Sequence, residues 1–143
     1  HLSVHSFPTR RSSDLGVASQ ALGIGRAALQ EARRLLPAGS GGLDRWEADL
    51  RTAQLLILRA ATLKDLGRPF TREASMAKLY ATEAANRVAL EAYRAVAQAT
   101  AAPSARLERA VRDVRVTTIY EGTSEIQRLV IARKVLQEGV APP

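Results

Sequence analysis

Apolar residues recur every three or four positions along most of this chain, and that spacing restricts its fold more than any other feature. No segment alternates apolar and polar residues for long enough to predict a strand. Hydrophobic residues make up 46% of the chain but aromatic residues only 4%, so the core must consist of Ala, Leu, Val and Ile. This composition favours closely packed helices.

Five helices are predicted, separated by short connections that contain Pro, Gly or Ser. Their approximate ranges are 17–36, 44–67, 71–99, 103–121 and 124–137. Asp44 is the expected N-cap of the second helix, and Ser124 with Gln127 forms a capping-box pattern for the fifth. Short connections between long helices favour antiparallel neighbours. We therefore predict an all-α fold, an up-and-down helical bundle of four to five helices.

The first fifteen residues do not share the pattern of the rest. Residues 5–15 read HSFPTRRSSDL, show no helical or strand period, and resemble the in-frame translation of a common sequencing-library adapter. We expect residues 1–15 to be a non-native, disordered segment that contributes nothing to the fold. The helical domain then covers 16–138, residues 139–143 form a tail, and the natural sequence before Gly16 is missing.

The composition excludes several kinds of chemistry. The chain has no Cys, and its two histidines, His1 and His5, both lie in the first five residues. A thiolate or histidine metal site, a Cys nucleophile and a Ser-His-Asp triad are therefore not expected, and no metal is predicted. Acid-base chemistry is left to carboxylates, Tyr or Lys.

The net charge of +7 is explained most simply by a solvated surface or an anionic ligand. A nucleic-acid interface would use the arginines of the fourth predicted helix, Arg106, Arg109, Arg112 and Arg115. Glu108 and Asp113 interrupt that series, so nucleic-acid binding is not expected. No apolar stretch approaches the roughly 20 residues of a membrane-spanning helix, and no signal peptide is recognised, so a soluble, cytoplasmic protein is expected.

The most informative segment for function surrounds Glu121. Gly122 follows this carboxylate, so Glu121 is expected in an irregular turn between two helices. The backbone N–H groups of Thr123, Ser124 and Glu125 then lie at a helix N-terminus, where an anion is favoured. This arrangement suits a base beside a cofactor, although a solvated turn glutamate without chemical function has the same sequence pattern.

Several motifs resemble the C-terminal helical domain of the acyl-CoA dehydrogenase family. They are IYEGTSEIQR, the upstream Glu108-Arg109-Ala110-Val111-Arg112-Asp113, and the segments 67–89 (GRPFTREASMAKLYATEAANRVA) and 16–32 (GVASQALGIGRAALQEA). They occur in the family's order and spacing, and the similarity spans about 16–138. The run that contains IYEGT is the most specific of these motifs.

The resemblance implies an FAD enzyme that oxidises an acyl-CoA thioester to its 2,3-enoyl form. Glu121 would be the base that removes the α-proton, with its pKa raised by a dry environment. Gly122 would approach the substrate, Tyr120 would line the same pocket or serve in the core, and the cofactor contacts would be Thr123, Ser124 and Glu125. An electron-transfer flavoprotein-type acceptor and a homo- or hetero-oligomer are further implied partners.

Two elements of that family are missing here. Its Arg-x-x-Phe-Gly segment, which reaches FAD in a neighbouring subunit, is absent because the connection 37–46 is about a dozen residues shorter. Its Gln-x-x-Gly-Gly-x-Gly-Tyr element would place its Gln on Arg94 and its paired glycines on Ala97 and Gln98. We therefore expect part of a divergent enzyme subunit that is inactive in isolation. The alternative is a non-catalytic helical bundle that mediates oligomerisation.

Overall fold

The computed structural model describes residues 7–139, and for residues 7–11 only the backbone. Within that range the elements are all helical, and no strand is present. The helices are α1 (Phe7–Leu35), α2 (Leu43–Asp65), α3 (Thr71–Thr100), α4 (Ala105–Arg115), the 3₁₀ turn η2 (Val116–Thr118) and α5 (Ser124–Glu138). The predicted all-α up-and-down bundle of four to five helices is confirmed.

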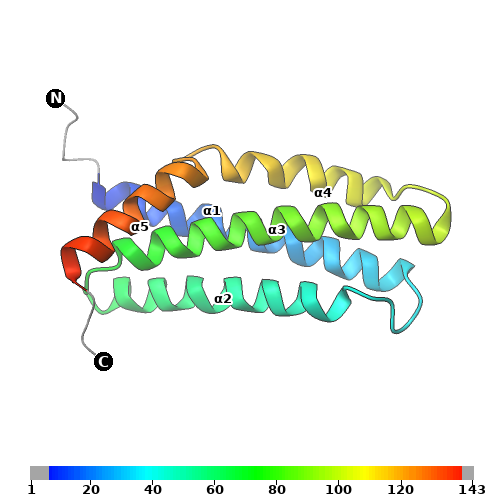
Figure 1. The fold of residues 1–143 in the computed structure, drawn as a ribbon, viewed down its shortest axis with the longest axis horizontal. Helices are drawn as coiled ribbons and strands as arrows, with labels where there is room; N and C mark the ends of the chain where they lie inside the picture. The colour runs from blue at the N-terminus through cyan, green and yellow to red at the C-terminus, as the bar shows by residue number, and fades with distance from the viewer. Residues whose placement is uncertain (1–6, 140–143) are drawn as a thin grey trace.

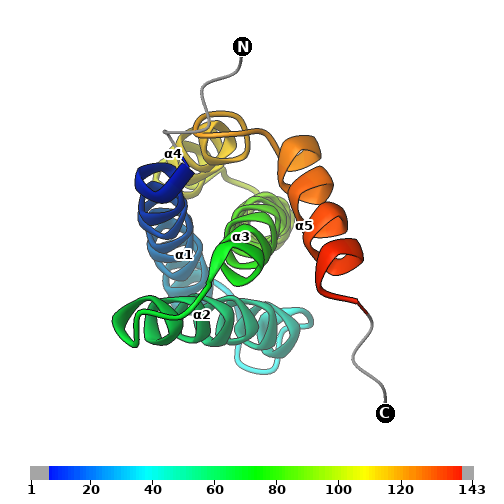
Figure 2. The ribbon, with the colours of Figure 1, turned by 90° about the vertical axis from the view of Figure 1, so that its left-hand side faces the viewer.

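Helix α3 is the centre of the bundle. The other four α-helices surround it in the end-on view (Figure 2), and each of them packs against it. α1 and α2 run antiparallel, as do α3 and α4, so the α1–α2 and α3–α4 connections lie at the same end of the molecule (Figure 1). The turn that contains Glu121 lies away from that end, between α4 and α5.

Small side chains let the helices approach α3 closely. Its inner face carries alanines with no exposed surface, namely Ala74, Ala77, Ala81, Ala85, Ala89 and Ala92. Opposite them, a Cβ atom added to Gly25 of α1 would lie 2.7 Å from Leu50 Cδ2 and 3.1 Å from Ala85 Cβ. The α1 backbone therefore packs directly on its neighbours, as the Ala-rich sequence predicts.

Two of the predicted caps are wrong. Gly42, with φ +101°, precedes α2, whereas Asp44 lies in the first turn and accepts a hydrogen bond from the Arg45 N–H at 2.9 Å. A Cβ atom on Gly42 would lie 2.9 Å from the buried Trp46 ring, so packing favours glycine there. The cap of α5 is described with its site below.

The start of α1 also differs from the prediction. The helix begins at Phe7 instead of residue 17, and Asp14 and Leu15 are buried at 2% and 9% exposure. Leu15 packs in a cluster with Ala60, Ala74 and Ala77. The expectation that residues 1–15 contribute nothing to the fold is therefore wrong for Asp14 and Leu15. Residues 1–6, and Val140 to Pro143 of the predicted tail, lie outside the described residues.

Leu15→Ala should lower the free energy of unfolding by about 2–3 kcal/mol, because it leaves a cavity between α1, α2 and α3. Urea unfolding of the 143-residue chain measures this change. Leu136→Ala is the matched control, since Leu136 is 83% exposed and its loss should cost less than about 0.5 kcal/mol. Equal effects of the two substitutions would show that residue 15 does not pack in the core.

Candidate active site

Glu121 lies in a turn with an unusual backbone. Its φ is +59°, and Gly122 follows with φ +98°, so two consecutive residues occupy the left-handed side of conformational space. A non-glycine residue in that region is uncommon and costs about 1 kcal/mol or more. The φ angle of Gly122 favours glycine at this position, and a Cβ atom there would also displace Gln127 Nε2, which would lie only 2.9 Å away. The predicted irregular turn between two helices is present.

The carboxylate of Glu121 is exposed in this chain, and its Oε2 accepts a hydrogen bond from Ser13 Oγ at 3.2 Å. The dry environment that the resemblance implies is therefore not supplied by the residues that the structure describes. Any group that covers Glu121 must come from outside the described residues.

Tyr120 lies beside α1. It is half-buried, and its hydroxyl donates a hydrogen bond to Gln20 Oε1 on α1. This contact joins the hydroxyl end of Tyr120 to α1. A role in substrate binding remains a hypothesis for Tyr120.

The N-terminus of α5 is capped by Thr123, not by Ser124. Thr123 Oγ1 accepts a hydrogen bond from the Ile126 N–H at 3.4 Å. Ser124 is 9% exposed, and Gln127 is buried at 2% exposure beneath the turn instead of completing a capping box. Both side chains that suggested a capping box are therefore packed inward.

Glu125 reaches back over the same helix end. A hydrogen bond from its own backbone N–H, with a second from the Thr123 hydroxyl and the positive charges of Arg128 and Arg115, lowers the pKa of the Glu125 carboxyl. Burial opposes this shift only partly. The carboxylate is thus held ionised beside Thr123, where the helix dipole favours negative charge.

Beside this helix end lies a hollow of about 280 Å³. Its lining combines hydroxyl, amide and charged groups, from Glu83, Asn86, Arg115, Thr118, Ile119, Thr123, Ser124 and Glu125. Three of these residues, Thr123, Ser124 and Glu125, are the predicted cofactor contacts. The structure thus brings them together on the wall of one hollow, directly after Glu121 and Gly122 in the chain.

Lys78 is the residue that sequence reasoning missed. It occupies a buried position of α3 at 1% exposure, and its Nζ donates hydrogen bonds to the carbonyls of Tyr120 and Gly122. The signal was a single cation one residue after Ala77 and three before Ala81, on the apolar face of a helix. That spacing was not used to predict its burial, and only the tertiary structure shows that Lys78 is buried and what it contacts.

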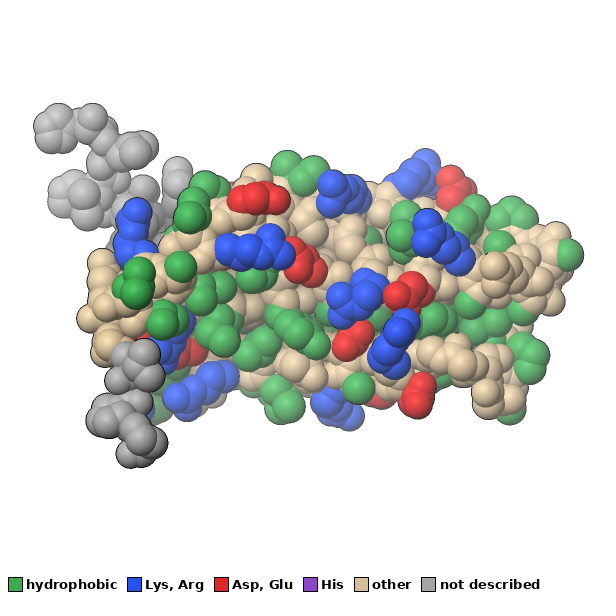
Figure 3. All heavy atoms as spheres, viewed as in Figure 1, with side chains coloured by type: hydrophobic (Ala, Val, Ile, Leu, Met, Phe, Trp, Pro, Cys, Tyr) green, Lys and Arg blue, Asp and Glu red, His purple; other side chains and the backbone are tan. Residues whose placement is uncertain are grey.

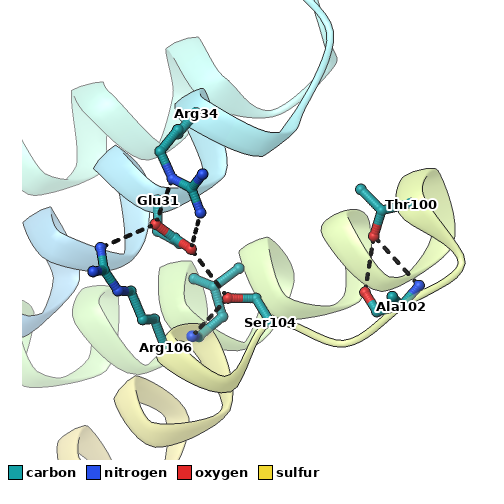
Figure 4. A network of polar contacts seen from close by, with 7 residues as sticks. Glu31, Arg34, Thr100, Ala102, Ser104 and Arg106 are labelled. Atoms are coloured by element: carbon teal, nitrogen blue, oxygen red, sulfur yellow. Dashed lines mark hydrogen bonds and ion pairs between the residues drawn. The ribbon is translucent and has the colours of Figure 1, made fainter.

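A polar cluster centred on Glu31 lies at the end of the bundle that carries the α1–α2 and α3–α4 connections (Figure 4). Its carboxylate accepts two hydrogen bonds from Arg34 at 2.9 and 3.1 Å and one from Ser104 Oγ at 3.3 Å, and it lies 3.7 Å from Arg106 Nη1. The Arg34 hydrogen bonds chiefly lower the pKa of Glu31, against the effect of burial. This cluster ties α1 to the start of α4.

The positions of the missing glycine-rich element lie at this same end. Arg94, Ala97 and Gln98 are in the last turns of α3, which continues to Thr100. Their backbone N–H groups therefore lie within a continuous helix. In a glycine-rich loop the same groups would be free to bind a pyrophosphate.

Surface charges are mixed in sign. Basic and acidic side chains are interspersed over the face drawn in Figure 3. Of the arginines considered for nucleic acid, Arg112 lies 3.5 Å from Glu108, and Arg106 pairs with Glu31. Among residues 7–139 no group of three or more carboxylate, His or Cys side chains is arranged to hold a metal. None of the described helices combines the length and apolar character needed to span a membrane.

Fold and site together define a helical domain with one carboxylate in a strained turn before a helix N-terminus. Residues 13–136 match the family described as acyl-CoA dehydrogenase, C-terminal domain. The chain belongs to the acyl-CoA dehydrogenase family.

The relatives agree with this assignment. The short-chain specific mitochondrial acyl-CoA dehydrogenase of Bos taurus is 45% identical over 145 aligned positions, which cover 92% of this chain and 35% of that protein. Subunit CarC of the caffeyl-CoA reductase–Etf complex of Acetobacterium woodii is 37% identical, over 87% of this chain and 36% of the relative. The butyryl-CoA dehydrogenase structure from Megasphaera elsdenii superposes with a TM-score of 0.79 at 32% identity, over 90% of this chain and 37% of that one.

The chain thus spans about a third of the length of the relatives that it matches. Acyl-CoA dehydrogenases are FAD-dependent, and the hollow at the α5 N-terminus fits contact with part of such a cofactor. The other end of the bundle does not fit, since helix replaces the glycine-rich loop and the 36–42 connection is short. Of the regions that the structure describes, the lining of this hollow fits contact with FAD, and the opposite end of the bundle does not.

The 143-residue chain by itself should not retain FAD, because a 280 Å³ hollow can enclose only a fraction of that molecule. Ultrafiltration of the folded chain with FAD, followed by absorbance of the retained fraction, measures this. The full-length enzyme that contains the sequence serves as the control. Stoichiometric flavin retention by the isolated chain would contradict the prediction.

Proposed function

We propose that this chain is the C-terminal domain of an FAD-dependent acyl-CoA dehydrogenase, in which Glu121 is the base that removes the α-proton of an acyl-CoA thioester. The observation that carries the proposal is the position of Glu121. It is held in a left-handed turn immediately before the helix end that lines the hollow. Backbone in this region clusters at functional sites, and its occurrence at the one residue that the motif singles out as a base supports the proposal.

In the proposed reaction, a Glu121 carboxylate oxygen accepts the proton from the substrate's α-carbon. Bound FAD would accept the hydride from the β-carbon, so that the C–C single bond becomes the 2,3-double bond. The carboxylate ends protonated, and two electrons leave the substrate. The α-proton is too weakly acidic for a free carboxylate in water, so the substrate must also displace water from around Glu121.

The neighbouring residues have distinct proposed roles. Gly122 has no side chain, which lets the thioester approach the turn closely. Thr123, Ser124 and Glu125 line the hollow and would contact FAD. Tyr120 would bound the acyl side of the turn while its hydroxyl remains on Gln20.

The partners follow from the same proposal. Reoxidation requires an electron acceptor, and an electron-transfer flavoprotein-type protein is supported by the relative that is part of a caffeyl-CoA reductase–Etf complex. The absence of the Arg-x-x-Phe-Gly segment and of the glycine-rich element favours an oligomer in which another subunit completes the cofactor site. The proposed location is the cytoplasm. A purely non-catalytic, oligomer-forming role is not favoured, because the matched relatives are named as dehydrogenases and a reductase.

In the full-length enzyme, Glu121→Gln should slow flavin reduction by acyl-CoA about 10²- to 10⁴-fold, because the amide keeps the shape but cannot accept the proton. Substrate affinity should change little, since the carboxylate acts in the transition state. Rapid mixing, with flavin absorbance as the readout, separates the two quantities.

Glu108→Gln is the matched control, because Glu108 is an exposed glutamate on α4. It should leave both the rate and the affinity unchanged. Flavin reduction by Glu121→Gln at the parent rate would remove Glu121 as the base.

A further inference from the structure

Lys78 is a buried cation outside the set of residues discussed for catalysis. Its side chain is 1% exposed, in a stretch of α3 where Ala74, Ala77 and Ala81 have no exposed surface. Lysine is rarely buried to this extent without partners, because loss of hydration is costly. Burial lowers the pKa of Lys78, and the nearby negative charges of Asp14 and Glu121 oppose that shift.

The contacts of Lys78 converge on one place. Its Nζ lies 2.7 Å from the carbonyl oxygen of Tyr120 and donates a second hydrogen bond to the carbonyl of Gly122. These two carbonyls belong to the residues on either side of Glu121. One ammonium group therefore holds both ends of the short segment that presents the carboxylate.

The backbone needs such support at this point. Regular backbone hydrogen bonding reaches the Tyr120 N–H, which donates to Val116 O at 3.2 Å, and resumes where the Gln127 N–H donates to Thr123 O at 3.0 Å. Between these bonds the chain takes positive φ angles at Glu121 and Gly122. Strained backbone persists only where its surroundings determine it, and here Lys78 donates to both flanking carbonyls.

We propose that Lys78 is a positioning residue for Glu121: it fixes the carbonyls of Tyr120 and Gly122 and so sets the direction in which the Glu121 carboxylate points. The inference rests on the proposed function of Glu121. Lys78 acts through the backbone and has no contact with substrate in this assignment. A displacement of about 1 Å at a reacting group is enough to cost about 10²-fold in rate, so the support has a measurable effect.

The test uses Lys78→Met in the full-length enzyme, which keeps an unbranched stem of similar length but removes the charge and the three N–H donors. Flavin reduction should slow about 10- to 100-fold, while the dissociation constant of acyl-CoA should change less than about threefold. Lys64→Met is the matched control, because Lys64 is an exposed lysine on α2. A Lys78→Met rate within twofold of the parent would overturn the proposal.

The double variant Lys78→Met with Glu121→Gln separates this inference from the function on which it rests. If Lys78 acts through Glu121, the double variant should reduce its flavin no more slowly than Glu121→Gln, since no base remains to be positioned. Fully multiplicative losses would refute the positioning role. If Glu121→Gln itself retains the parent rate, the proposed function fails, whatever Lys78→Met does.

Lys78→Gln covers the case in which the methionine variant does not fold. Its amide keeps a hydrogen-bond donor one bond closer to the backbone, so it should recover part of the fold and part of the rate. Loss of the fold in both variants would contradict the proposal, because it would assign Lys78 to the stability of the whole domain instead of to the turn.

Discussion

Close packing against α3 is the constraint on which the rest of this structure depends. Its inner face presents alanines with no exposed surface, and Gly25 of α1 leaves room for no added atom. Larger side chains on either surface would push the helices apart and open voids, which a chain with only 4% aromatic residues has few large side chains to fill. Because the distances between α3 and its neighbouring helices are fixed, α3 is a rigid support for its own side chains, including Lys78.

The candidate site uses that support at one point only. Lys78 joins α3 to the turn between η2 and α5, and α5 supplies the helix end with Thr123, Ser124 and Glu125. Glu121 itself is exposed, so under the proposed function the domain would supply the position of the carboxylate but not a dry environment. This division fits a chain that spans about a third of its relatives' length, because water exclusion requires surfaces from elsewhere. The opposite end, closed around Glu31, has a structural explanation without a cofactor.

Helix existence was predictable, whereas helix ends were not. Apolar period and Pro or Gly breaks located all five α-helices. Asp44 and Ser124 were plausible caps by residue type, but buried Trp46 favours Gly42 before α2, and Ser124 packs inward so that Thr123 caps α5. The start of α1 was missed because Leu15 alone carries no periodic signal. Its burial depends on Ala60 and Ala77, which are far away in sequence.

The sequence by itself determined the helical class, the bundle topology and the position of Glu121 in an irregular turn, because periodicity, glycine and motif order are local properties of the chain. The resemblance of IYEGTSEIQR to the acyl-CoA dehydrogenase family was also recognisable from the sequence. Only the tertiary structure decided that Thr123, Ser124 and Glu125 share one hollow, and that Lys78 reaches the carbonyls around Glu121 from 42 and 44 residues away. Contacts between residues so far apart depend on how whole helices pack, and no local pattern encodes that geometry.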